Sequence, residues 1–175
     1  MKVRVVNGQA IFSAETLQAL REPVLDNARG LPASVYTSQS FFDVEQESLF
    51  PKTWMGIAFD TDVPKCGDAI PLTVQGLPLI LVRDNEGIVR VLHNVCRHRA
   101  TLVLDEPCEA LTNFKCPYHG WTYDLQGGLI ATPFWDGTPG SKSIPVDPCK
   151  NSLVPVRCQV WNHVVFVNLA VSYTH

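Results

Sequence analysis

The first fifty residues contain two stretches in which apolar and polar side chains follow the spacing of an α-helix. Ser13 is a suitable N-cap for a helix that runs towards Pro23. After Ser40 a second helical pattern interleaves polar positions with five apolar ones, and Pro51 limits it; the apolar positions are Phe41, Phe42, Val44, Leu49 and Phe50. Residues 31–38 are interpreted as a linker between the two helices.

From Trp54 onward the pattern changes to short apolar or alternating runs separated by turn residues, which is typical of β-strands. A hairpin is expected at 123–130 with its turn at the glycines, and a loop rich in turn formers at 133–145. The remaining expected strands are 54–59, 69–75, 77–83, 88–92 and 160–169. The sequence therefore predicts an all-β body of short antiparallel strands, with helices confined to the N-terminal third.

The composition excludes several classes of protein. Of the 175 residues, 46% are hydrophobic and 18% are charged, which is enough apolar material for a core and excludes intrinsic disorder. A formal net charge of −3 gives nucleic acid no electrostatic reason to bind. The opening residues lack the continuous apolar segment of a secretory signal, and residues 158–175 are interpreted as a strand and not a membrane span. We therefore expect a cytoplasmic protein with no nucleic-acid or membrane partner.

Two short motifs bring thiols and imidazoles together at metal-ligand spacing. Cys96-Arg97-His98 is followed, after 17 intervening residues, by Cys116-Pro117-Tyr118-His119. Structural zinc sites usually use a C-x₂₋₄-C arm and a separate pair of histidines, so that each arm is chemically uniform. Here each arm supplies one Cys and one His, which suits a binuclear centre with one iron on both cysteines and the other on both histidines, the ligand set of a Rieske [2Fe–2S] cluster. A zinc site, or cysteines with a purely structural role, are the alternatives.

The residues around these motifs resemble the cluster loops of Rieske oxygenases. The run from Cys116 to Trp121 is similar to the second loop of those enzymes, and Cys96-Arg97-His98-Arg99 is similar to the first. The enzymes commonly have glycine at the next position, where this chain has Ala100, and we expect this departure to change the backbone freedom of the loop. The resemblance implies a Rieske-type [2Fe–2S] cluster as the metal centre. Its four ligands would be Cys96, His98, Cys116 and His119.

The resemblance covers about residues 54–170 and implies a Rieske fold. Such a fold consists of short antiparallel sheets with a small inserted cluster-binding subdomain, expected here at about 94–134. With two ferric ions, two sulfides and two thiolates, the cluster is neutral and takes a charge of −1 on reduction. Less accumulated charge opposes reduction than in an all-cysteine cluster, so the site is expected to carry electrons.

The respiratory Rieske proteins fit this chain less well. They have an extra cysteine in each loop, which together form a disulfide, and the matching positions here are Thr101 and Tyr118. They also have a serine after the His-Gly pair, whose hydroxyl donates to a cluster sulfide, and this chain has Trp121 there. Because losing that hydrogen bond lowers the potential, we expect a value towards the low end of the Rieske range.

Two hypotheses remain for the function. In the first, the chain is the N-terminal, electron-receiving part of a Rieske oxygenase α subunit of the ring-hydroxylating dioxygenase type, an oxidoreductase that hydroxylates or demethylates an organic substrate with O₂. In the second, it is a stand-alone Rieske ferredoxin that delivers electrons to a separate oxygenase. The segments around Tyr36, Phe41 and Phe50 resemble the lead-in of the α subunits, whereas simple ferredoxins begin almost directly at the first strand. The first hypothesis is therefore favoured, with a helical lead-in at 1–53 and a Rieske domain at 54–170.

The catalytic domain of such an oxygenase is expected to be absent from these 175 residues. Its mononuclear Fe(II) needs two histidines and a carboxylate in one cluster, and His93, His163 and His175 show no such arrangement. No catalytic residue is therefore expected in the chain, and the substrate is not predicted. By resemblance, the partners are a reductase or ferredoxin electron donor and further copies of the subunit, as a trimer. The expected electron outlet is His119, framed by Tyr118 and Trp121.

The other candidate residues have simpler interpretations. Arg97 and Arg99 either balance the charge of the reduced cluster, face a redox partner or are merely solvated. His93 is expected at a strand end, His163 as a packed or edge residue within the last strand, and Pro133 in a turn or in a third loop that shields the cluster. Four cysteines are expected to be free thiols: Cys66, Cys108, Cys149 and Cys158.

Overall fold

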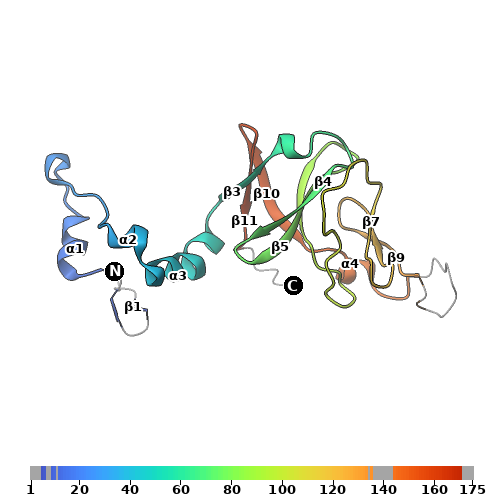
Figure 1. Cartoon of the computed structure of the whole chain (residues 1–175), viewed down its shortest axis with the longest axis horizontal. Helices are drawn as coiled ribbons and strands as arrows, with labels where there is room; N and C mark the ends of the chain where they lie inside the picture. Colours follow the sequence, from blue (N-terminus) through green and yellow to red (C-terminus); the bar gives the residue numbers. More distant parts are fainter. Residues whose placement is uncertain (1–4, 7–8, 11, 134, 136–143, 171–175) are drawn as a thin grey trace. The chain divides into compact units, whose positions relative to one another are not determined.

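The computed structural model describes residues 5–6, 9–10, 12–133, 135 and 144–170 (Figure 1). The chain divides into two units, Met1–Pro51 and Lys52–His175. His175 and most of the loop expected at 133–145 lie outside the described residues. Within the described part of the chain, no helix has the length and apolar character needed to cross a membrane.

The first unit contains short helices and two antiparallel strands of two residues each, β1 (Val5–Val6) and β2 (Gln9–Ala10). The Ser13 hydroxyl caps α1 (Ala14–Ala19) as expected, by accepting from the Thr16 amide, although the helix is shorter than predicted. The second expected helix is α3 (Gln39–Ser48), which begins one residue before Ser40 and is capped by the Ser38 hydroxyl. The linker interpretation of 31–38 was wrong in part, because α2 (Ser34–Thr37) lies within it; η1 (Leu25–Asn27) and η2 (Phe50–Lys52) are single 3₁₀ turns.

A six-stranded antiparallel sheet forms the body of the second unit, in the order β3-β11-β10-β6-β5-β4. The predicted strands up to residue 92 are confirmed within a residue or two: β3 (Met55–Phe59), β4 (Ala69–Val74), β5 (Leu77–Arg83) and β6 (Val89–His93). A 3₁₀ turn, η3 (Asp60–Asp62), follows β3. The all-β prediction for this body is confirmed, but α4 (Pro148–Asn151), capped by the Asp147 carboxylate, lies outside the N-terminal third to which helices were expected to be confined.

The single strand predicted at 160–169 was wrong. The chain instead forms a hairpin of β10 (Pro155–Trp161) and β11 (Val164–Asn168), joined by Asn162 and His163. Both turn residues have positive φ, 49° and 66°, which is the geometry of a tight two-residue hairpin turn. The turn contains no glycine, so the usual sequence signal for a break in the strand is missing.

A second, three-stranded sheet is inserted in the sequence between β6 and β10, which are neighbours in the large sheet. It consists of β7 (Phe114–Lys115), β8 (Thr122–Tyr123) and β9 (Leu129–Ala131). The expected hairpin between β8 and β9 is confirmed: Gly127 has a φ of 95°, and the Asp124 carboxylate accepts from the amide of Gly128 across the turn. The inserted sheet lies beside α4 in Figure 1. The first cysteine–histidine motif lies between β6 and β7, and the second lies between β7 and β8.

Strand β5 separates two apolar cores. Leu79 and Leu81 point into one core, with the inward residues of β6, β10 and β11. Ile80 and Val82, which alternate with them, point into the other core, shared with the inserted sheet. This second core includes Cys96, Cys116, Trp121 and Tyr123, so the motif loops are anchored to the main body by burial of apolar surface.

Candidate metal centre

The first loop, residues 96–101, follows β6 and is closed by hydrogen bonds between backbone groups. The amide of Cys96 donates to the carbonyl of Thr101 at 2.9 Å, and the amide of Ala100 donates to the carbonyl of Cys96 at 2.9 Å. Ala100 has a φ of 58°, in the left-handed region that glycine adopts more readily than alanine. The missing glycine noted in the sequence therefore coincides with a strained position.

The second loop, residues 116–121, joins β7 to β8 and has the same frame. The amide of Cys116 donates to the carbonyl of Trp121 at 2.8 Å, and the amide of Gly120 donates to the carbonyl of Cys116 at 3.0 Å. Gly120 has a φ of 72°, and a Cβ added there would lie 3.0 Å from Cγ of Pro133. Glycine is thus required in this loop by both conformation and space.

The two thiols are buried at the base of the loops. Cys96 is 2% exposed and Cys116 is 3% exposed. The hydroxyl of Tyr123 lies 3.3 Å from Sγ of Cys96 and also accepts from the amide of Arg97. Burial raises the pKa of the Cys116 thiol, and the neighbouring Cys96 raises it further, because two adjacent thiolates repel each other without a positive charge between them. The pair is therefore suited to binding a cation.

The two imidazoles lie next to each other and border the same cavity as Cys116. The ring centroids of His98 and His119 are 4.7 Å apart, with an interplanar angle of 72°. Nδ1 of His119 is buried and has no hydrogen-bond partner, which is costly unless the lone pair binds something the protein chain does not supply. Burial lowers the pKa of His98, and the charges of His119 and Arg99 lower it further, which favours the neutral form that binds metals.

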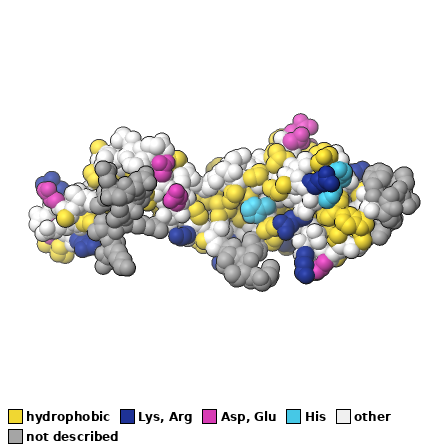
Figure 2. Space-filling model, turned by 90° about the horizontal axis from the view of Figure 1, so that it is seen from below, with side chains coloured by type: hydrophobic (Ala, Val, Ile, Leu, Met, Phe, Trp, Pro, Cys, Tyr) yellow, Lys and Arg dark blue, Asp and Glu magenta, His cyan; other side chains and the backbone are white. Residues whose placement is uncertain are grey.

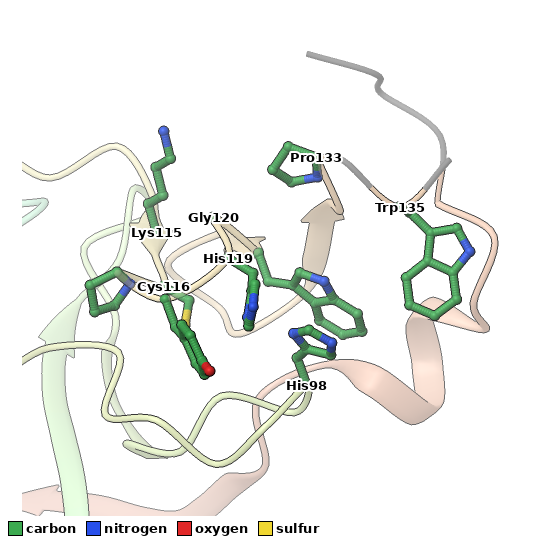
Figure 3. Close-up of a pocket in the computed structure, with 10 residues that line it drawn as sticks. His98, Lys115, Cys116, His119, Gly120, Pro133 and Trp135 are labelled. Carbon is green, nitrogen blue, oxygen red and sulfur yellow. The ribbon is translucent and has the colours of Figure 1, made fainter. Parts of the chain in front are cut away.

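Aromatic rings pack against both histidines. Trp121 stacks on His98 with a ring-centroid distance of 4.9 Å and an interplanar angle of 8°. The ring centroids of Tyr118 and His119 are 3.8 Å apart. Figure 3 shows His98 and His119 side by side, with Cys116 to one side of them and Trp135 to the other. The rings border a cavity of about 540 Å³.

The donor set fits a binuclear iron–sulfur cluster. Thiolates and neutral imidazoles are the protein ligands of a Rieske-type cluster, and each iron needs only two of them because sulfides complete its coordination. Among the described residues, no three Cys, His, Asp or Glu side chains surround one point closely enough to hold a single metal ion. The buried thiols and the unpartnered Nδ1 of His119 fit the donor set of such a cluster.

The remaining candidate residues do not join this site. His93 ends β6 as expected, and its pKa is lowered by burial and by Arg97. The interpretation of His163 as a residue within the last strand was wrong, because it occupies the β10–β11 turn, where Nδ1 lies 3.1 Å from Oδ1 of Asp60. No disulfide bond joins the four cysteines that were expected to be free thiols, which are Cys66, Cys108, Cys149 and Cys158. Arg97 and Arg99 are exposed, and Arg97 donates to the carbonyl of Lys150 at 3.5 Å.

Two supporting residues were missed at the level of sequence. Asn94 is 2% exposed, and its Oδ1 accepts from the amides of Val103 and Leu104, both at 2.9 Å, so that it brackets the first loop. Tyr123 was interpreted only as a hairpin residue, although its hydroxyl reaches the first loop. The position of Asn94, two residues before the first cysteine, was the only signal available for it; the contact of Tyr123 depends on the tertiary fold.

Comparisons with known proteins agree with this geometry. The sequence model described as "Rieske [2Fe-2S] domain" matches residues 53–145. The α subunit of N,N-dimethyl phenylurea N-demethylase from Sphingobium sp. (strain YBL2) is 36% identical over 124 residues, which are 71% of this chain and 26% of that subunit. The carnitine monooxygenase oxygenase subunit of Escherichia coli (strain K12) is 31% identical over 139 residues, 79% of this chain and 36% of that subunit.

Solved structures show the same relationship. The structure of a quaternary ammonium Rieske monooxygenase superposes on this chain with a TM-score of 0.68 and 30% sequence identity. That structure is described with reference to carnitine oxidation and inter-subunit electron transfer. It covers 81% of this chain, which in turn covers 38% of that protein. The chain thus spans between about a quarter and two fifths of the length of these relatives, all of which are oxygenase proteins or their subunits.

Proposed function

Because the chain belongs to the Rieske [2Fe–2S] domain family, we propose that Cys96, His98, Cys116 and His119 hold the cluster of that family. The observation that carries this assignment is a pair of buried thiols together with two adjacent imidazoles, one of which has an unpartnered, buried Nδ1; Cys116 and both imidazoles border the same cavity. When bound, such a cluster takes up and releases a single electron at potentials between about −150 and +300 mV. The chain is therefore an electron-transfer domain.

The residues around the site determine how it supports this transfer. The Tyr123 hydroxyl can donate to Sγ of Cys96, and such a hydrogen bond stabilises negative charge on the sulfur. Trp121 stands where respiratory Rieske proteins have a serine, and its ring stacks on His98 without supplying a hydroxyl. Since fewer donors reach the sulfurs, we place the potential towards the low end of the range, at about −150 mV.

The whole protein is proposed to be a Rieske oxygenase that hydroxylates or demethylates an organic substrate. Its relatives are oxygenase subunits, and their matches extend over more of the chain than the Rieske domain alone, which favours this function over a stand-alone ferredoxin. In this proposal residues 1–53 form a helical lead-in, 54–170 form the Rieske domain and about 94–134 form the cluster-binding subdomain. A mononuclear Fe(II) site would belong to a separate catalytic domain.

The proposed partners follow from the same family relationship. A reductase or ferredoxin supplies the electron, and the electron leaves at the edge of His119 towards an acidic residue of a neighbouring subunit in a homo-oligomer, a trimer. Support comes from the partly exposed ring of His119 beside the exposed Tyr118, and from the inter-subunit electron transfer described for the related monooxygenase. Such an arrangement shortens the path between the cluster and the mononuclear iron of the neighbouring subunit.

The ligand assignment is tested by metal and sulfide analysis of the purified chain. We expect about two irons and two acid-labile sulfides per chain, and a Rieske-type EPR signal with an average g value below 2 after reduction. Cys96→Ser and Cys116→Ser should each abolish the signal, whereas the control Cys158→Ser, a free thiol distant in the sequence from the loops, should keep it. If the chain purified from cells supplied with iron contains stoichiometric zinc and no sulfide, the assignment is wrong.

The oxygenase role is tested with a chimera. The chain replaces the corresponding N-terminal part of the E. coli carnitine monooxygenase oxygenase subunit, to which it is 31% identical. We expect the chain alone to accept one electron and consume no O₂ with carnitine, and the chimera to show carnitine-dependent O₂ consumption. If the chimera is inactive while the chain alone efficiently reduces a separate oxygenase, the ferredoxin function replaces the oxygenase one.

A further inference from the structure

One face of the six-stranded sheet is covered by the inserted sheet over only part of its width. Ile80 and Val82 of β5 and Leu92 of β6 share a core with the inserted sheet. Leu92 is paired with Pro155, so the same face continues across β10, β11 and β3 (Figure 1). Within the described part of the chain, the side chains of that continuation are half-buried or exposed. This half of the sheet face is therefore uncovered.

The uncovered half carries large apolar side chains. Trp161 of β10 is 72% exposed, and its ring centroid lies 6.4 Å from that of Phe166 of β11. Phe166 lies opposite Gly56 of β3, which has no side chain to cover the ring, and Phe59 lies opposite Val164 and is 56% exposed. We call Phe59, Trp161, Val164 and Phe166 the apolar face. Figure 2 shows, from one side, that hydrophobic side chains also gather at the surface of this unit between charged ones.

The two ends of the apolar face carry opposite charges. At the end formed by the β10–β11 turn, Asp60 is paired with His163, and the exposed Asp62 accepts from the last amide of β3 at 2.8 Å. At the other end lies Arg157, which is exposed and is four residues before Trp161 on the same side of β10. The surface is therefore acidic at one end, apolar in the middle and basic at the other end.

Such a surface is complementary to itself when a second copy is turned end over end. A two-fold axis that crosses the three strands sets the turn end of one copy over the opposite end of the other, and each contact is made twice. Trp161 of each copy then meets Arg157 of the other, which allows a cation–π contact, and Asp62 adds a favourable charge. Phe166 belongs to the middle row of the face, so its ring lies near the axis and meets its own copy.

We propose that the apolar face binds a second copy of this chain in an isologous dimer, with Trp161 as its anchor. Pairing removes the apolar side chains of both copies from water, and tryptophan is among the residues that contribute most to interfaces. The two sheets pack face to face, as in a β-sandwich. The interface uses β3, β10 and β11 and no residue of the cysteine–histidine loops, so it is independent of the proposed cluster.

The test is sedimentation equilibrium of the purified chain over a range of concentrations. We expect a monomer–dimer equilibrium whose dissociation constant rises about tenfold or more in Trp161→Ala, because the indole is lost from both halves of the interface. The control is Ile130→Ala, which truncates a side chain that is 46% exposed on β9 of the inserted sheet and should leave the constant unchanged. A chain that is monomeric at every concentration, or equal effects of the two variants, overturns the inference.

A pair of charge reversals tests the end-over-end arrangement. Arg157→Glu and Asp62→Arg should each raise the dissociation constant about tenfold or more, because each sets like charges against each other at both ends of the interface. Mixed in equal amounts, the two variants should recover most of the affinity, since every acid then faces a base. A variant that had merely lost its fold would not recover on mixing. If the mixture dissociates as readily as either variant alone, the inference is wrong.

Discussion

The first and second loops differ in sequence spacing but share one backbone frame. In each, the amide of the cysteine donates to the carbonyl five residues later, and the carbonyl of the cysteine accepts from the amide four residues later. In each, that fourth residue has a positive φ, 58° at Ala100 and 72° at Gly120. The histidine is two positions after the cysteine in one loop and three positions after it in the other, so the frames place their imidazoles differently and the rings meet edge to face.

The loops also differ in what closes them at the base. The second loop is bracketed by a strand pair, in which Lys115 of β7 lies opposite Thr122 of β8. The first loop has no such pair around it, and the side chain of Asn94 bonds to the backbone of Val103 and Leu104 instead. One loop therefore depends on repeated backbone pairing, and the other depends on a single amide side chain.

The largest effect expected from this difference is that of Asn94→Ala. The variant leaves the buried amides of Val103 and Leu104 without their acceptor, and we expect the free energy of unfolding to fall by about 3 kcal/mol. Urea denaturation followed by fluorescence measures it. Asn113→Ala, which removes only an exposed hydrogen bond to Thr112, is the control and should cost less than about 0.5 kcal/mol. Equal costs for the two variants would show that the first loop does not depend on Asn94.

Gly120→Ala should have the next largest effect, because it challenges the second loop in two ways. The alanine must adopt a φ of 72°, and its Cβ would lie 3.0 Å from Cγ of Pro133. We expect a loss of about 2 kcal/mol in unfolding free energy. Gly76→Ala separates the two causes, since Gly76 has a φ of 74° but no atom near the added Cβ, and should cost about 1 kcal/mol. If the two variants cost the same, the contact with Pro133 is not tight.

Much of this architecture could be predicted from the sequence because alternating apolar runs and glycine turns are local signals. The bounds of β5 were correct at both ends, and the hairpin at Gly127 was found from its glycines. The β10–β11 turn was missed because Asn162 and His163 reach positive φ without a glycine. The β7 strand was missed because it has only two residues, so no alternation can be seen.

The candidate site divides in the same way between local and tertiary signals. The pairing of Cys96 with His98, and of Cys116 with His119, follows from motif spacing alone, and their convergence agrees with it. The contact of Tyr123 with Cys96 joins residues 27 positions apart, and that of Trp121 with Trp135 depends on the turn after β9. Neither contact has a sequence motif, because each is produced by how the inserted sheet packs.

The loop between β5 and β6 differs from the first and second loops because a carboxylate side chain accepts its closing hydrogen bonds. Asp84 accepts from the amides of Glu86 and Ile88 and from the guanidinium of Arg90. Burial alone would raise the pKa of Asp84, but these hydrogen bonds outweigh it and the pKa is lowered from 3.8. A lowered pKa in the folded state stabilises the protein above the unfolded value, and this stabilisation is lost as the pH falls through the folded value.

Asp84→Asn should therefore lower the unfolding free energy by about 1.5 kcal/mol at pH 7, and by less as the pH falls below about 4. Urea denaturation of the unmodified chain and the variant at several pH values measures the difference. The frames of the first and second loops contain no carboxylate, so the cost of Gly120→Ala should not change over the same range. A difference for Asp84→Asn that is constant down to pH 3 would contradict the assignment of the charge.

The smallest expected effect, and the only stabilising one, is that of Ala100→Gly in the first loop. Alanine at a φ of 58° is less favourable than glycine by about 1–2 kcal/mol, and the greater freedom of glycine in the unfolded chain returns part of this gain. We expect a net increase of about 0.5 to 1 kcal/mol in unfolding free energy, opposite in sign to Gly120→Ala at the equivalent position. Because Ala100 is exposed, losing its methyl group removes little packing, and the cluster content should stay the same. A destabilised Ala100→Gly variant would show that the two loops do not share one frame in solution.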